Sequence, residues 1–361
     1  PEVRLSGFGL EDTHSVMNSL EWGPDGWLYG VNGSTTTGKV TCPATGRLWE
    51  WQGQMVWRYH PNSRRFEIYA EGGGNTFSLE IDAVGRVFSG SNHGNTRGMY
   101  YPQGSYGKKG WGKHGPLTNP YAFGYFNHMA HEGDRNRFAQ AFCIYGGGLY
   151  PPTFRGKIIA PNSLHNVIWV SQLHRDTSTW RTVDEANLAE TDDRWFRPVF
   201  AGVGPDGCVY VADWSDTRLS HVRPVDDWHK ASGRIYRFKP AGTRPAYDGT
   251  DLATLSGREL LPYLKHPNTF LRRRATLEIG WRKERSIEPD LVRKVRADLG
   301  QESLESLWAL ALLGRLGEKD AVDWLEHPDP HVRRWVMRLK GDEGKVSDAF
   351  AQALLRRATI D

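Results

Sequence analysis

The residues best suited to acid–base chemistry lie near the start of the chain, where Asp12 stands two positions before His14. An imidazole has an unperturbed pKa of about 6.5, so it can accept a proton at neutral pH, and a neighbouring carboxylate can orient or polarise it. We therefore predict that His14 is a catalytic base and that Asp12 assists it. A loop histidine that caps a backbone carbonyl is the alternative interpretation.

Further polar side chains follow short segments that are typical of strands. His93 and His165 each come two or three residues after such a segment, and we predict that both contact a ligand. Arg135 can bind a carboxylate through two parallel hydrogen bonds. His128 and His131 are three positions apart, a spacing that would place both on one side of a helix and suit a metal ion. The sequence does not identify a metal.

The segments before these residues form a repeat. Each copy starts with glycine, has an aliphatic residue two positions on, and reaches a small or polar residue six positions on. The copies span residues 26–32, 85–91, 156–162 and 207–213. The first and last copies follow the same Gly-Pro-Asp-Gly turn, in which proline sets φ and glycine supplies a positive φ. A period of roughly 40–60 residues with about four strands is typical of a β-propeller blade. A β-sandwich with coincidental turns is the alternative.

The sixth residues of these copies would occupy equivalent points around a central axis if the repeated strands are the innermost strand of each blade. These residues are Asn32, Ser91, Asn162 and Asp213. We predict that they form a polar ring that orients a ligand through hydrogen bonds, with Trp214 stacking on a sugar face. Asn, Ser and Asp are also common turn residues, so a purely structural role at strand ends is the alternative.

A long segment over residues 95–126 is rich in Gly, Tyr, Trp and Lys and shows no periodicity. Loops of this length are usually functional or disordered. We expect its aromatic side chains to cover the mouth of the channel as a lid.

The composition changes near residue 250. Most of the 40 glycines, 20 prolines and 15 tryptophans lie before it, which indicates short strands and turns, and leucine-rich sequence with helical spacing follows. We predict a mainly β propeller domain over residues 1–240, a linker over 241–254 and an all-α domain of HEAT-like repeats over 255–361. About four blades are visible, so we expect an incomplete six-bladed propeller.

Two stretches of the helical region resemble each other. Both carry His-Pro after an apolar segment, at His266 and at His327, and continue through a short turn into a basic helix start. This arrangement is similar to the stacked helix pairs of HEAT-type repeats. We predict that the arginines at 272–274 form a solvated helix face, and a patch for an acidic ligand is the alternative.

The charge and cysteine patterns argue against several classes of protein. The 46 basic and 42 acidic side chains give a net charge of +4, without the clustered positive excess that nucleic-acid binding needs. No apolar run approaches the roughly 20 residues of a membrane helix, so we expect no membrane span in the chain. Cys42, Cys143 and Cys208 form no zinc motif and no CxxCH attachment for haem c.

The stretch from Gly7 to Gly30, with Asp12-Thr-His14 and the turn at Gly23, resembles the membrane-bound-dehydrogenase-like propeller family. That family is related to sorbosone dehydrogenases and, more distantly, to soluble quinoprotein glucose dehydrogenase. Further stretches similar to the same family span 137–149, 150–166, 197–214 and 233–237. The resemblance covers roughly residues 5–240, and the trailing helical repeats fit the family's domain order.

The resemblance implies a quinoprotein-type sugar or alcohol dehydrogenase that oxidises a small carbohydrate-like substrate at the channel mouth. It implies pyrroloquinoline quinone and Ca²⁺ as cofactors, an electron-acceptor cytochrome as a partner, and a periplasmic or secreted location. In such enzymes a histidine shortly before the Gly-Pro-Asp turn is the general base. His14 precedes Gly23 by nine residues, one more than the family pattern. The chain carries Arg97 but no Arg-Asn-Pro motif of the kind that holds the quinone in related proteins.

Two other functions stay open on the sequence. A propeller followed by helical repeats makes two rigid surfaces, so the chain could be a non-catalytic carbohydrate- or protein-binding scaffold, with a protein partner on the helical repeats. The missing haem segment and the small blade count favour this alternative. A calcium-dependent lactone hydrolase of similar fold would use Asn162 and Asp213 as metal ligands.

Overall fold

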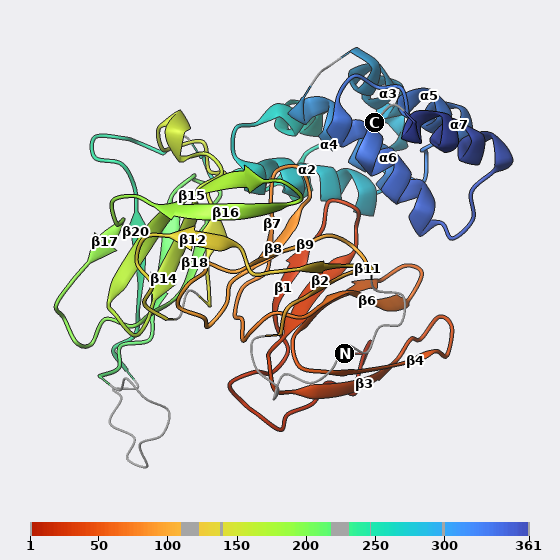
Figure 1. The fold of residues 1–361 in the computed structure, drawn as a ribbon. Helices are drawn as coiled ribbons and strands as arrows, with labels where there is room; N and C mark the ends of the chain where they lie inside the picture. The colour runs from red at the N-terminus through yellow and green to blue at the C-terminus, as the bar shows by residue number, and fades with distance from the viewer. Residues whose placement is uncertain are drawn as a thin grey trace. The chain divides into compact units, whose positions relative to one another are not determined.

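The computed structural model describes residues 2–109, 123–137, 140–217, 231–245, 247–297 and 300–359, with only the backbone of residues 123 and 124. The chain divides into two compact units (Figure 1). The first comprises residues 1–23 and 27–246 and is built of β-strands, and the second comprises residues 24–26 and 247–361 and is helical. A β-rich region followed by a helical region is therefore confirmed.

The described part of the first unit holds five sheets. The first sheet has the order β1 (Asn18–Trp22), β2 (Leu28–Asn32), β5 (Met55–His60), β6 (Arg65–Glu71), β10 (Ser105–Gly107) and β11 (Phe123–Phe126). A hairpin joins β3 (Thr37–Thr41) to β4 (Leu48–Gln52), and the next sheet joins β7 (Glu80–Ile81), β8 (Val87–Ser89) and β9 (Met99–Tyr101).

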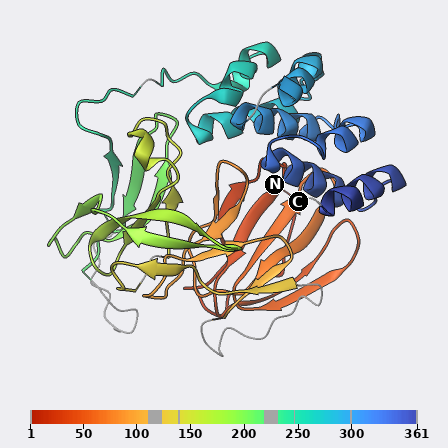
Figure 2. The same cartoon turned by 45° about the horizontal axis from the view of Figure 1, so that its top comes forward.

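The two remaining sheets come from residues 130–238. One has the order β12 (Ala130–Glu132), β16 (Thr179–Asp184), β15 (Val167–Asp176), β14 (Ile158–Asn162) and β13 (Cys143–Ile144), with β17 (Ala189–Glu190) also pairing with β15. The last joins β18 (Pro198–Val203), β19 (Val209–Asp213) and β20 (Arg234–Phe238). Figure 2 shows these sheets lying in succession.

Four hydrophobic clusters fill the spaces between successive sheets. The first lies between the β3–β4 hairpin and the β1 sheet, with Trp51 from the hairpin and Trp57 from β5. The second lies between the β1 and β7 sheets, the third between the β7 and β14 sheets, and the fourth between the β14 and β18 sheets. The unit is therefore a series of sheets packed face to face, and a cluster of apolar side chains joins each pair.

Alternation along single strands lets one sheet contribute to two clusters. Val87 lies in the second cluster while its neighbour Phe88 lies in the third. In β14, Ile158 belongs to the third cluster and Ile159 to the fourth. Successive side chains of a strand point to opposite faces, so strands covered on both sides need apolar residues at consecutive positions.

The predicted repeat corresponds to equivalent strands, β2, β8, β14 and β19. Each begins two residues after its glycine, and the four glycines have similar φ values of 78°, 75°, 81° and 79°. Each of the four lies next to the strand at one end of its sheet and has a neighbour on both sides. The prediction that these are the innermost strands is therefore wrong, because a strand at the inner edge of a sheet has only one neighbour.

The segment over residues 95–126, predicted as a lid, lies partly outside the described residues. Its described part contains β9, β10 and β11, so this part is not a loop without regular structure. Residues 110–122 are among those that the structure does not describe.

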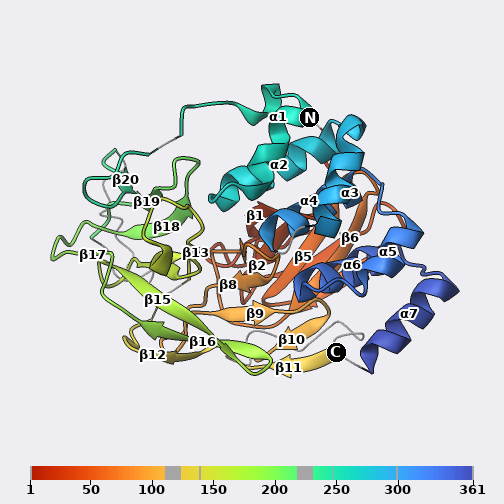
Figure 3. The ribbon, with the colours of Figure 1, turned by 90° about the horizontal axis from the view of Figure 1, so that it is seen from above.

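The second unit consists of short helices. They are α1 (Gly257–Leu260), α2 (Thr269–Trp281), α3 (Glu288–Ala297), α4 (Gln301–Leu312), α5 (Glu318–Trp324), α6 (Pro330–Asp342) and α7 (Asp348–Ala358). Helix α4 packs against α2, α3 and α6 (Figure 3). Among the described residues after 255 no strand occurs, as predicted.

The two His-Pro stretches form the same clamp before α2 and α6. Nδ1 of His266 accepts the backbone N–H of Asn268 at 3.0 Å, and Nη1 of Arg272 donates to the His266 carbonyl at 2.5 Å and to the next carbonyl at 3.1 Å. The second clamp makes the same contacts from His327, Asp329 and Arg333, at 3.1, 2.7 and 3.1 Å. The resemblance in sequence thus corresponds to a repeated helix entry.

Arg272 does not belong to a solvated helix face. Its side chain is 4% exposed and its Nε lies 3.1 Å from Oε1 of Glu305, whose side chain is 2% exposed. Thr276 donates a hydrogen bond to the other oxygen of Glu305 at 2.8 Å. The prediction for this arginine is wrong because its guanidinium pairs with the carboxylate of Glu305 on α4 inside the helical unit. The two residues are distant in the sequence.

The repeated glycine turns allow a test of the β-rich fold. Gly156 and Gly207 both have a positive φ, but an added Cβ meets no atom within 4 Å at Gly156, whereas it lies 2.7 Å from the Gly147 carbonyl oxygen at Gly207. Gly156→Ala should lower the free energy of unfolding by about 1–2 kcal/mol through backbone strain alone. Gly207→Ala should lower it further. Urea denaturation of both variants measures the difference.

Gly341 provides the control for these substitutions. It lies in α6 at ordinary helical φ with open space around its Cα, so Gly341→Ala should leave stability unchanged or raise it by up to about 1 kcal/mol. Equal losses at 156 and 207 would contradict the assignment of a tighter turn at Gly207.

Candidate functional site

Hydrogen bonds join the loops of the β1 sheet to those of the β7 sheet. Nδ2 of Asn75 donates to the backbone carbonyl of His14 at 2.7 Å, and the backbone N–H of Asn75 donates to Oδ1 of Asn92 at 3.0 Å. The Asn92 carbonyl in turn accepts from Nε of Arg137 at 3.5 Å. Loops that lie far apart in the sequence are therefore held next to one another.

The same series continues to the β14 sheet. Nδ2 of Asn162 donates to the Arg137 carbonyl at 2.8 Å, while Oδ1 of Asn162 accepts the backbone N–H groups of Leu164 and His165 at 2.9 and 3.3 Å. We call this series the polar loop belt. It comprises His14, Asn75, Asn92, Arg137, Asn162 and His165.

The residues predicted to form a polar ring are buried. They are Asn32, Ser91 and Asn162, each 0% exposed, and Asp213, which is 5% exposed. Nδ2 of Asn32 donates to the Thr36 carbonyl at 3.1 Å, and Oδ1 of Asp213 accepts the backbone N–H of Ser215 at 2.9 Å. The side chains of Asn32 and Asp213 therefore hold the loops that leave their strands, and a ligand-binding ring of the four residues stays a prediction.

The Asp12–His14 pair lies on an exposed loop that joins the belt through the His14 carbonyl. Nδ1 of His14 is 3.4 Å from Oδ1 of Asp12, and the imidazole is 66% exposed. The backbone N–H of His14 also donates to Oδ1 of Asp12 at 2.9 Å, and the Thr35 hydroxyl donates to Oδ2. The Thr35 hydrogen bond, together with those from His14, holds the pKa of Asp12 below its ordinary value although partial burial raises it. The carboxylate stays ionised beside the imidazole.

His93 lies against a second histidine. Its backbone N–H donates to Oγ of Ser91 at 3.4 Å, and its ring centre is 4.7 Å from that of His128. Burial, and then the positive charge of Arg137, lower the pKa of His93. The imidazole is therefore predominantly neutral at pH 7, a state in which it can accept a hydrogen bond.

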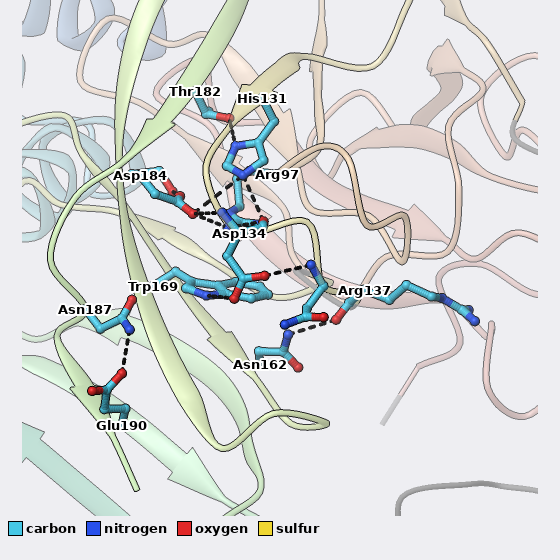
Figure 4. A network of polar contacts seen from close by, with 12 residues as sticks. Arg97, His131, Asp134, Arg137, Asn162, Trp169, Thr182, Asp184, Asn187 and Glu190 are labelled. Carbon is cyan, nitrogen blue, oxygen red and sulfur yellow. Dashed lines mark hydrogen bonds and ion pairs between the residues drawn. The ribbon is translucent and has the colours of Figure 1, made fainter.

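The other predicted ligand contacts are on the surface. Arg135 and His165 are exposed, and Trp214 is 50% exposed. Figure 4 shows the Arg137 side chain extending away from Asn162, although its backbone belongs to the belt. The structure thus places Arg135, Arg137, His165 and the Asp12–His14 pair on connected loops, whereas Trp214 is on the loop after β19.

A buried ionic network that the sequence analysis missed lies next to the belt (Figure 4). Nη2 of Arg97 is 2.6 Å from Oδ2 of Asp184, and the Arg97 side chain is 0% exposed. Nε2 of His131 is 3.5 Å from the same oxygen, and Ser171 donates to the other oxygen at 2.6 Å. Although burial raises the pKa of Asp184, the hydrogen bonds from His131 and Ser171 and the charge of Arg97 hold it at about 2.

This network fixes the loop that carries Arg135 and Arg137. The backbone N–H of Asp134 donates to Oδ2 of Asp184 at 2.9 Å, and the Asp134 carbonyl accepts from Nη2 of Arg97 at 2.9 Å. The Asp134 carboxylate accepts the indole N–H of Trp169 at 3.1 Å. The Arg97 guanidinium also lies 3.8 Å from the centre of the Trp169 ring.

His128 and His131 do not share a helix. His131 is in strand β12, and His128 is in the segment before it. Nδ1 of His131 is 2.9 Å from the Thr182 hydroxyl, and Nε2 of His128 is 3.1 Å from the Lys108 carbonyl. The predicted helix is wrong because the segment that contains His131 forms a strand that pairs with β16. Over the ranges that the structure describes, no group of three His, Cys, Asp or Glu side chains could hold a metal ion.

Comparison with known proteins gives a family match and a likeness to a solved structure. The model of the family described as Domain of unknown function (DUF7133) matches residues 2–242. A crystal structure of a "putative oxidoreductase (glucose dehydrogenase)" from Thermus thermophilus is similar with a TM-score of 0.39 and 17% identity, over 60% of this chain and 63% of that chain. This chain therefore spans less than two thirds of that protein. No curated protein matches the sequence. None of the described helices is long and apolar enough to cross a membrane.

The Asp184 network predicts a specific acid sensitivity. A carboxylate whose folded pKa is about 2 contributes stability that is present above the unfolded pKa of about 4 and is lost as the pH falls through 2. Asp184→Asn should abolish this loss between pH 4 and pH 2. It should also lower the free energy of unfolding at pH 7 by roughly 3–5 kcal/mol, because Arg97 would remain buried without its partner.

Denaturant unfolding across pH 2–7 measures both effects. Asp192→Asn is the matched control, because Asp192 is exposed. An Asp184→Asn protein that keeps the acid dependence of the natural chain would show that another carboxylate carries it.

Proposed function

The chain belongs to the family of proteins with the domain of unknown function DUF7133, and from its site we propose that it is a sugar or alcohol dehydrogenase of quinoprotein type. The observation that carries the proposal is the Asp12–His14 pair, an exposed imidazole beside an ionised carboxylate on a loop tied to the polar loop belt. The resemblance of residues 7–30 to membrane-bound-dehydrogenase-like proteins gives His14 the role of general base.

His14 would accept the proton of the substrate hydroxyl. Asp12 lies on the Nδ1 side of the ring at 3.4 Å and favours the tautomer with hydrogen on Nδ1, so Nε2 is the accepting nitrogen. As the ring becomes positively charged, the carboxylate stabilises it. Thr35 and the backbone of His14 hold that carboxylate in one position.

The substrate's hydride needs an acceptor, and pyrroloquinoline quinone would supply that chemistry when bound. It is a tricarboxylate, and the exposed loop that carries Arg135 and Arg137 offers the cations that carboxylates bind. His93 follows Asn92 of the belt. Burial and the charge of Arg137 keep its imidazole neutral, so it can accept a hydrogen bond from a ligand. These residues fit an anionic cofactor or substrate.

Calcium fits the described residues less well. They contain no group of three His, Cys, Asp or Glu side chains that could hold a metal ion. Asn162, a ligand in the lactone hydrolase alternative, uses both amide atoms on backbone groups, donating to the Arg137 carbonyl and accepting from the backbone N–H of Leu164. The structure therefore gives that alternative no support.

The architecture around this site has two finer features within the proposal. The stacked sheets, with equivalent strands and equivalent glycine turns, would be blades of an incomplete propeller. The helical unit, with its duplicated His-Pro clamp, would be a set of HEAT-like repeats. A protein partner on those repeats, an electron-acceptor cytochrome and a periplasmic location belong to the same proposal.

Substitution of His14 tests the proposed base. His14→Gln should lower kcat for dye-coupled oxidation of aldoses by the roughly 10²–10⁴-fold that general base catalysis contributes. The melting temperature should stay nearly unchanged, because two thirds of this side chain is exposed to solvent. His174→Gln, on β15 and outside the belt, is the control and should keep full activity.

The opposite pattern would contradict the assignment of His14 as the general base. If His14→Gln retained its activity and lost roughly 1 kcal/mol of stability, the histidine would be a structural residue of its loop. A chain with no activity in any form would leave the non-catalytic scaffold as the better account.

Cofactor binding has its own test. Saturating pyrroloquinoline quinone with Ca²⁺ should raise the melting temperature of the protein, because a ligand that binds only the native state stabilises it. Arg137→Gln should weaken this shift by removing a cation from the belt, whereas Arg175→Gln, an exposed arginine in the β15–β16 hairpin, should not. An unchanged melting curve at saturation would contradict the quinoprotein proposal.

A further inference from the structure

We propose that Thr35 is a positioning residue for the Asp12–His14 pair. Its hydroxyl keeps the Asp12 carboxylate turned toward the imidazole of His14, and two buried hydroxyl groups behind Thr35 keep that hydroxyl turned toward Asp12. The effect of Thr35 on turnover rests on the proposed function, in which His14 is the base. The hold of Thr35 on Asp12 does not, so the two can be tested separately.

Thr35 reaches Asp12 from a different loop. Asp12 and His14 precede β1, whereas Thr35 lies between β2 and β3. The Thr35 hydroxyl donates to Oδ2 of Asp12. The other oxygen, Oδ1, accepts the backbone N–H of His14 at 2.9 Å and lies 3.4 Å from Nδ1 of its ring. One oxygen of the carboxylate is therefore anchored to the second loop, and the other faces the imidazole.

Three hydroxyl groups lie in succession behind Asp12. Oγ of Ser15 is 2.6 Å from Oγ1 of Thr35 and 2.8 Å from Oγ1 of Thr36. We call these three groups the hydroxyl cluster. Ser15 and Thr36 are both buried, and the Thr36 carbonyl accepts from Nδ2 of Asn32 at 3.1 Å. The hydroxyl cluster thus connects the exposed pair to a buried residue at the end of β2.

The charge of Asp12 gives the hydroxyl cluster one direction. An ionised carboxylate only accepts hydrogen bonds, so the single hydrogen of the Thr35 hydroxyl points to Asp12. The short contact between Thr35 and Ser15 then takes the hydrogen of Ser15. Thr36 supplies its own hydrogen to Ser15, whose carbonyl it reaches at 2.7 Å. Solvent does not offer Ser15 or Thr36 other partners, because both are buried, so the Thr35 hydroxyl is held in one orientation.

This orientation matters when His14 accepts a proton. The ring then becomes positively charged, and a carboxylate stabilises that charge best when it is already in place beside Nδ1. The ordinary pKa of an aspartate is about 4, so Asp12 is ionised at neutral pH with or without Thr35. Thr35 therefore acts on turnover through the position of the carboxylate and not through its charge.

Thr37 provides a matched control on the same two loops. Its hydroxyl donates to Oε1 of Glu11, and this hydrogen bond lowers the pKa of Glu11. Thr35 and Thr37 are both half-buried. The carboxylate beside Nδ1 of His14 is that of Asp12. Thr37→Val therefore removes an equivalent hydroxyl from a different carboxylate.

Three variants measure the effect on turnover. Thr35→Val keeps the shape of the side chain and removes the hydroxyl. It should lower kcat for dye-coupled oxidation of aldoses roughly tenfold, the loss that corresponds to one hydrogen bond to a charged group, and leave KM nearly unchanged. Thr35→Ser keeps a hydroxyl and should keep kcat. Thr37→Val should also keep kcat, with a melting temperature similar to that of Thr35→Val.

An NMR titration of the Asp12 carboxyl carbon measures the contact without any activity. The ¹³C resonance is identified by its absence from Asp12→Asn. The pKa of Asp12 should rise in Thr35→Val, because the Thr35 hydrogen bond is the largest influence that lowers it. It should not change in Thr35→Ser or in Thr37→Val.

Two results would overturn the proposal: an unchanged pKa of Asp12 in Thr35→Val, or equal losses of kcat in Thr35→Val and Thr37→Val. Failure of the proposed function gives a different result. His14→Gln would then be fully active, while Thr35→Val would still raise the pKa of Asp12, and the hold of Thr35 on Asp12 would stand.

Discussion

Burial of both faces is the constraint on which the β-rich unit depends. A sheet between two hydrophobic clusters has no side for polar groups, so consecutive residues such as Val87 and Phe88, or Ile158 and Ile159, are apolar and serve different clusters. Polar side chains within the strands, such as Ser171 and Thr182, are buried and hydrogen-bonded. The polar loop belt lies where the strands end and the loops begin, so its asparagine, arginine and histidine residues are not confined between two apolar clusters.

The sequence was sufficient where the signal is local. The four glycine turns were predictable because proline and glycine restrict φ over a few residues, and the His-Pro clamps because all their groups lie within seven residues. The order of strands within each sheet was not predictable, since it depends on pairing between segments far apart. The repeated strands were therefore given the wrong place at the inner edge of their sheets.

The same limit explains what was missed in the site. Arg97, His131 and Asp184 are separated by 34 and 53 residues and belong to different loops and strands. Their charges are matched only after the sheets pack, and no motif marks them. The prediction of an exposed Arg272 was wrong for the same reason, because its partner Glu305 lies on another helix, 33 residues later. Asp12 and His14, two positions apart, could be recognised as a pair directly.

Some residues of the polar loop belt contribute a backbone group to it, and others contribute a side chain. From His14 and Arg137 the belt accepts hydrogen bonds at backbone carbonyl oxygens, while the amide side chains of Asn75 and Asn162 supply the donors. Any amino acid has a carbonyl, so position 14 can change its side chain without breaking its hydrogen bond to Asn75. A change at position 137 keeps the hydrogen bond from Asn162 but removes the one from Nε of Arg137 to the Asn92 carbonyl. At position 14 the framework and the reactive group are thus encoded separately. Natural variation could exchange one chemistry for another here while the asparagines preserve the geometry of the loops.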